Sequence, residues 1–108
     1  MNRALLLNRA RPANKWERMF WIYHDQNPQV FKRFDQMATD MFLRGRRRYS
    51  ACTIISVIRF EFDLQADDPN SVFKINQNYA GYYARLLLQL MPELPDTFFE
   101  LRQLKATA

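Results

Sequence analysis

One amphipathic pattern between Val30 and Phe42 limits this chain more than any other feature of its sequence. Apolar side chains recur there at the three- and four-residue spacing of an α-helix, and polar side chains fill the other positions. Asn27-Pro28 precedes the pattern as a start signal, because Asn can cap a helix and Pro tolerates its first position. Gly45 follows as a left-handed stop. The pattern predicts a core helix of about 16 residues.

An earlier helix is predicted after Asn14, which has the capping-box spacing to Glu17. Its apolar face would comprise Trp16, Met19, Phe20 and Tyr23. Residues 1–13 are basic and contain Pro12, so we interpret them as a flexible basic N-terminal arm and residues 14–108 as a single helical domain.

The segment 51–63 has features of both a helix and a strand. Ser50 is a good N-cap, and one helical stripe contains Ala51, Ile54, Ile55, Ile58 and Phe62. Its many β-branched residues and the alternation in RFEFDL favour a strand instead. We expect a helix because the cap and the stripe agree, and the strand alternative stays open at this point.

Two more helices are expected towards the C-terminus. The first has an apolar face of Tyr79, Tyr82, Tyr83, Leu86, Leu87 and Leu90. Asn76 or Asn78 can cap it, and Pro92 ends it. Asp96 would cap a last helix over residues 97–106.

Length and composition agree with a small helical fold. A chain of 108 residues is the size of one domain, and 48% hydrophobic residues are enough for a core. Only two glycines occur, too few for the turns of a β-sandwich. We therefore predict an all-α fold, a single compact domain of four to five helices. In a winged-helix-like variant, residues 72–75 would form one short β element.

Positive charge is concentrated in the first part of the chain. Residues 1–59 have a net charge of +8 and residues 60–108 a net charge of −3. The arginines Arg44, Arg46, Arg47 and Arg48 stand between two predicted helices, and arginine forks suit phosphate oxygens. The helix start at Ser50 would add backbone N–H donors. The run predicts contacts to a nucleic-acid backbone, with a solvated loop as the alternative.

A polar stretch before Tyr79 is the candidate for recognition. Asn and Gln side chains can pair with adenine, and Lys or Arg can bind phosphates. The candidate residues are Lys74, Asn76, Gln77, Asn78 and Arg85. Capping and turn formation would explain the two asparagines equally well.

Reactive groups are sparse in the sequence. His24 and Cys52 are the only histidine and the only cysteine, and they lie far apart. We interpret them as a satisfied structural histidine and a buried thiol. One His and one Cys do not supply a zinc site, and no glycine-rich phosphate loop occurs. We expect no enzyme activity, no metal and no cofactor.

The sequence also bears on location. A single cysteine permits no internal disulfide, which fits a reducing compartment. The longest apolar run near the start, Ala4–Leu7, is shorter than a signal-peptide core, and no stretch has the length of a membrane span. We expect a cytoplasmic protein without membrane contact.

From residue 27 onward the chain resembles a set of small phage and prophage proteins without an established activity. The resemblance rests on NPQVFKRF, RGRRRYSACTIISVIRFE, FKINQNYAGYYARL and FFELR, in that order and spacing. It implies a phage or prophage origin and a role in the cytoplasm of an infected bacterium. No functional residue is carried over from it.

This origin and the charge pattern give two functional expectations. The first is binding of nucleic acid, in the first place DNA, as a regulator or accessory factor. The alternative is an inhibitor that binds an acidic host protein, for example a component of antiviral defence. The sequence predicts no oligomeric state.

Overall fold

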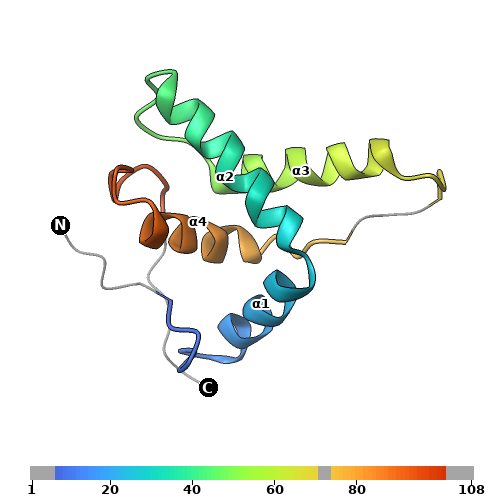
Figure 1. Ribbon diagram of the computed structural model, residues 1–108, viewed down its shortest axis with the longest axis horizontal. Coiled ribbons are helices and arrows are strands. Elements are labelled where there is room, and N and C mark those ends of the chain that lie inside the picture. Colours follow the sequence, from blue (N-terminus) through green and yellow to red (C-terminus); the bar gives the residue numbers. More distant parts are fainter. Residues whose placement is uncertain (1–6, 71–73, 102–108) are drawn as a thin grey trace.

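The computed structural model describes residues 7–70 and 74–101, which form four α-helices and no strand (Figure 1). The helices are α1 (Lys15–Gln26), α2 (Pro28–Leu43), α3 (Ala51–Gln65) and α4 (Tyr79–Leu90). The predicted all-α fold is confirmed. Residues 51–65 are helical despite their β-branched side chains, so the cap and the apolar stripe outweigh strand propensity there.

Two expected elements differ from the structure. Residues 97–101 form turns and irregular backbone in place of the start of a last helix, and residues 102–106 lie outside the described residues. In the predicted β element, Lys74 and Ile75 are not in a strand, and residues 72–73 lie outside the described residues.

The starts of α1 and α3 follow the local capping signals, whereas Asn27 before α2 and Asn78 before α4 make no side-chain capping hydrogen bond. The Asn14 side chain accepts a hydrogen bond from the Glu17 backbone N–H at 3.0 Å, and Ser50 Oγ accepts one from Thr53 at 3.1 Å. Gly45, after the end of α2, has φ +93°, a conformation that glycine adopts without strain. These signals involve only neighbouring residues, so the sequence predicted them correctly.

Helix α4 lies at the centre of the fold and contacts each of the other three helices. All its residues from Tyr79 to Leu88 are buried except Gly81, which is half-buried. Tyr83 has no exposed surface, and its ring lies 4.8 Å from that of Phe20 and 5.8 Å from that of Phe34. Burial raises the pKa of the Tyr83 hydroxyl above its ordinary value. The core is therefore an aromatic cluster around α4.

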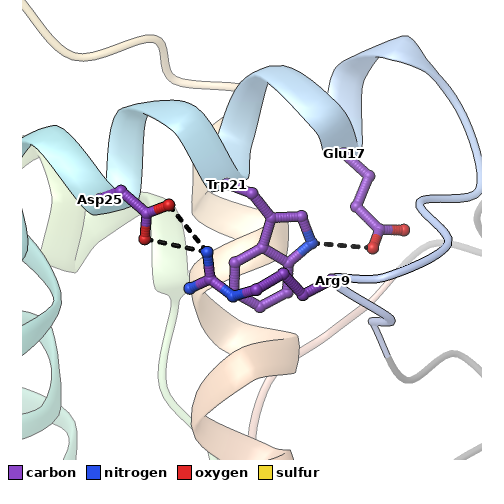
Figure 2. A network of polar contacts seen from close by, with 4 residues as sticks. All are labelled: Arg9, Glu17, Trp21 and Asp25. Atoms are coloured by element: carbon purple, nitrogen blue, oxygen red, sulfur yellow. Dashed lines mark hydrogen bonds and ion pairs between the residues drawn. The ribbon is translucent and has the colours of Figure 1, made fainter.

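The segment before α1 is held to the domain by the buried carboxylate of Glu17. Figure 2 shows the hydrogen bond of this carboxylate to Trp21 and the ion pair of Arg9 with Asp25. Glu17 is 1% exposed and accepts hydrogen bonds from Trp21 Nε1, the Asn8 N–H and the Ala13 N–H, each at 3.0 Å. The Arg9 guanidinium lies 4.3 Å from the centre of the Trp21 ring and forms an ion pair with Asp25. These contacts attach the segment to one side of α1.

In place of a separate arm, residues 7–13 form part of the helical domain. Leu7 is buried, and its backbone N–H and C=O both bond the Gln89 side chain of α4. Residues 1–6 of the predicted arm lie outside the described residues.

The inward face of α1 matches the predicted face at Phe20 and at Tyr23, which packs against the core, and differs from it elsewhere. Its buried residues are Glu17, Phe20 and Trp21, whereas Trp16 and Met19 are exposed. The reason is the segment 8–13, which covers Glu17 and supplies the donors that a buried carboxylate requires. A capping-box spacing does not reveal that the glutamate will be buried.

We predict that Glu17→Ala lowers the free energy of unfolding by about 3 kcal/mol, because one buried donor, Trp21 Nε1, and two partly buried backbone donors lose their acceptor. It should also expose the chain at Arg9 and Arg11 to trypsin, since the segment would detach. Urea denaturation and limited proteolysis measure the two effects. Asp25→Ala, which removes only the exposed ion pair with Arg9, is the control and should have a much smaller effect. Equal losses for both variants would contradict a central role for Glu17.

His24 lies among aromatic rings of the core. Its ring is 5.9 Å from that of Phe20 and 5.5 Å from that of Phe31, and its Nδ1 is buried without a hydrogen-bond partner among the described residues. The prediction that the hydrogen-bonding groups of His24 are satisfied is therefore wrong for Nδ1. Burial lowers the pKa of His24, Arg9 lowers it further, and Asp25 raises it.

We predict that stability falls as pH is lowered from about 7 to about 5, because the unfolded chain then takes up a proton at His24 that the folded chain resists. His24→Phe should flatten this part of the profile, measured as melting temperature against pH. The lowered pKa values of Asp25 and Glu61 place their titration below this window. A wild-type profile that is flat over this range would contradict the prediction.

Candidate functional site

An open cleft of about 970 Å³ lies between the start of α3, the first half of α4 and two loops. The loop after α2 supplies Arg46, Arg48, Tyr49 and Ser50. Helix α3 supplies Ala51, Cys52 and Thr53, and the region around α4 supplies Gln77, Asn78, Ala80, Gly81 and Arg85. The C-terminal side is formed by Phe98, Glu100 and Leu101. Three stretches of the chain that are distant in sequence, residues 46–53, 77–85 and 98–101, thus converge on one hollow.

The loop after α2 is fixed at both ends. The Arg46 N–H bonds the Met41 carbonyl at 3.1 Å, and the Tyr49 N–H bonds the Phe98 carbonyl at 2.9 Å. The Arg46 guanidinium lies 5.5 Å from the centre of the Tyr49 ring, a cation–π contact. These contacts hold one exposed arginine beside the cleft while its guanidinium N–H groups stay accessible.

The floor of the cleft contains a buried arginine of α4. Arg85 is 5% exposed, and its Nη1 donates to the Gly81 carbonyl at 3.1 Å. A Cβ at position 81 would lie 2.9 Å from this Nη1, so the glycine leaves room for the guanidinium. Burial lowers the pKa of Arg85 from its ordinary value, and Tyr82 opposes this effect. Even so, arginine stays protonated in proteins, so the floor is positively charged.

Gln77 connects the turn before α4 to α3. Its Nε2 donates to the Cys52 carbonyl at 3.1 Å, and its Oε1 accepts from Arg59 Nη2 at 3.0 Å. The same Arg59 nitrogen donates to the Ile75 carbonyl at 2.9 Å. Both ends of the Gln77 amide are therefore engaged within the protein, and its structural role differs from the predicted role in recognition.

Five of the nine predicted site residues line the cleft, namely Arg46, Arg48, Gln77, Asn78 and Arg85. Four do not, namely Arg44, Arg47, Lys74 and Asn76. The structure therefore divides the predicted arginine run, since Arg46 and Arg48 line the cleft and Arg44 and Arg47 do not.

The four outlying residues have their own surroundings. Arg44 forms an exposed ion pair with Asp40, with 3.3 Å between nitrogen and oxygen. Arg47 and Lys74 are exposed, and the Lys74 carbonyl accepts a hydrogen bond from the Tyr23 hydroxyl at 2.9 Å. Burial raises the pKa of Tyr23 to about 12, so this donor stays protonated near neutral pH.

The two asparagines form the turn in front of α4. Asn76 Oδ1 accepts from the Asn78 N–H at 2.9 Å, which closes an Asx turn. Asn78 is the residue before α4, but its side chain makes no capping hydrogen bond. It is exposed at the rim of the cleft.

Several lining residues were absent from the sequence prediction. Cys52 is exposed at the start of α3, so its prediction as a buried thiol is wrong. Phe98, Glu100 and Leu101 reach the cleft through a chain segment that runs back to the loop at Tyr49. No local sequence signal links these two segments, because their contact is a backbone hydrogen bond that any residue could make.

The cleft has a positive balance of charge. Its lining contains three arginines, Arg46, Arg48 and Arg85, and one carboxylate, Glu100. The first turn of α3 adds the positive end of a helix dipole and N–H groups that have no partner within the helix. The arrangement is suited to an anion that can spread over several donors.

Comparisons with known proteins add no further assignment. No family model matches the chain, and no curated protein or solved structure shows significant similarity to it. Within residues 7–70 and 74–101, no helix has both the length and the apolar character needed to cross a bilayer. The same residues contain no group of three or more His, Cys, Asp or Glu side chains placed to hold a metal ion.

We predict that Gln77→Ala lowers the free energy of unfolding by about 1–2 kcal/mol, because the Arg59 donor and the Cys52 carbonyl lose a partner. Asn78→Ala is the matched control and should change it by less than about 0.5 kcal/mol, as for an ordinary surface position. Urea denaturation of both variants provides the measurement. If the two variants were equally stable, Gln77 would not connect the two helices as described.

Proposed function

We propose that this protein binds the phosphate backbone of nucleic acid, in the first place DNA, in the cleft between α3 and α4. One observation carries the proposal. Arg46, Arg48 and Arg85 come from two separate parts of the chain and line the same open hollow. Such convergence supports a binding role better than net charge does, because scattered surface charge already serves solubility.

The chemistry of the cleft favours phosphate groups. Arg46 and Arg48 are exposed and can form forked hydrogen bonds to phosphate oxygens, while Arg85 supplies positive charge from below. The start of α3 adds backbone donors on the same side. Contacts of this kind position a nucleic acid without specifying its sequence. Among the predicted recognition residues, Asn78 at the rim is the one whose amide is both exposed and next to the cleft.

The arginine run offers a matched pair of variants that test the cleft directly. Arg46→Ala/Arg48→Ala removes two charges that line it, and Arg44→Ala/Arg47→Ala removes two exposed charges outside it. We expect the first variant to weaken binding of a DNA duplex by at least about tenfold and to lower the salt slope by about two. The control should lose much less. Fluorescence anisotropy against salt concentration, with duplex and single-stranded DNA and RNA, is the measurement.

The two variants distinguish binding of nucleic acid in the cleft from attraction of nucleic acid by the net charge of the protein. Equal losses in the two variants would show that affinity depends on net charge and would contradict the cleft as the binding site. Absence of binding to every nucleic acid would overturn the proposal altogether. Capture of one acidic host protein from nuclease-treated lysate, lost in Arg46→Ala/Arg48→Ala, would then favour the inhibitor alternative.

A further inference from the structure

Helix α3 has a second apolar face that points away from the core. Val57, Phe60 and Leu64 are 40%, 63% and 70% exposed. With Thr53, they recur at spacings of four, three and four residues, the pattern of a coiled-coil seam. The C-terminal half of α3 extends beyond α2 and α4 (Figure 1). Within the part of the chain that the structure describes, this face stays open to solvent.

The inner face of the same helix already serves the core. Ile54, Ile55 and Ile58 are buried, and α3 contacts both α2 and α4. A helix at a protein surface normally needs one apolar stripe, so a second stripe on the outside indicates a further contact.

Charges at the two ends of α3 show what kind of surface fits this face. The exposed Arg47 and Arg48 lie shortly before the helix, and the exposed Asp67 and Asp68 lie shortly after it. Opposite charges thus flank the apolar stripe at its two ends. A surface that complements the stripe needs an apolar centre with the charge order reversed, and an antiparallel copy of α3 provides reversed ends by symmetry.

We propose that the outer face of α3 is a homodimer interface in which two copies of α3 pack antiparallel around a two-fold axis. With the axis between Val57 and Phe60, Phe60 contacts the partner's Val57 and Leu64 contacts the partner's Thr53. Asp67 and Asp68 then lie close to the basic loop of the other copy. A parallel pair would place like charges together at both ends, which disfavours it.

The interface can be tested on the full chain by sedimentation velocity from micromolar to millimolar concentration. The wild type should dimerise, and Phe60→Ser should weaken the dimer by at least tenfold. Ile22→Ser is the matched control, because Ile22 is 53% exposed on α1. Circular dichroism would verify that both variants keep their helices. A wild type that is monomeric throughout, or a dimer that Phe60→Ser does not weaken, would overturn the proposal, as would equal weakening by Ile22→Ser.

Orientation is tested by neutralising the acidic end with Asp67→Asn/Asp68→Asn. Asparagine keeps the side-chain oxygen that accepts from the Asn70 N–H, so the turn after α3 should persist. An antiparallel dimer should weaken by about tenfold at low salt. A parallel dimer should strengthen, since like charges would be removed, and that result or an unchanged affinity would overturn the antiparallel arrangement. None of the substituted residues lines the cleft and the measurement contains no nucleic acid, so its outcome and the outcome of the nucleic-acid binding test can be told apart.

Discussion

Helix α4 is buried on almost every side, and the other elements are placed as they are because this helix must be covered. Phe20 of α1 and Phe34 of α2 pack on Tyr83, and Leu7 approaches from the N-terminal segment through Gln89. The turn at Gln77 attaches the start of the helix to α3. Between Tyr79 and Leu88 the half-buried Gly81 is the exception, and the cleft forms beside it, above the buried Arg85. The candidate site is thus a consequence of how the central helix is enclosed.

Local signals in the sequence predicted the secondary structure well, because they depend on neighbouring residues only. Asn14 and Ser50 cap their helices as expected, and the spacing of apolar residues identified α2 and α4. The last predicted helix is wrong over residues 97–101, because Asp96 and the apolar residues after it satisfy a helix pattern, while the structure buries Phe98 and Phe99 in the core from an irregular segment. Tertiary contacts override local propensity there.

Site residues were harder to predict, because their roles depend on burial. Arg46 and Arg48 line the cleft, but the sequence reasoning treated them alike with Arg44 and Arg47, which do not line it, because the path of the loop decides which arginines reach the cleft. Arg85 was a candidate for binding phosphates, and it is buried beneath the cleft against Gly81. A charged residue within an apolar pattern is normally solvated, so only the enclosure of α4 explains its position.

The two proposed surfaces, the cleft and the outer face of α3, meet at the start of α3, so binding at one of them would affect binding at the other. In an antiparallel dimer, the partner's Asp67 and Asp68 would lie near Arg48, which also lines the cleft. Phosphate groups and the partner's carboxylates would then compete for the same guanidinium. Because coupling between two binding events is reciprocal, nucleic acid would favour the monomer to the same degree that dimerisation weakens nucleic-acid binding. Substituting Phe60 would weaken the dimer without removing any charge, and Arg48 would then no longer face the partner's carboxylates. The variant would therefore bind nucleic acid more tightly than the wild type at concentrations where the wild type is dimeric.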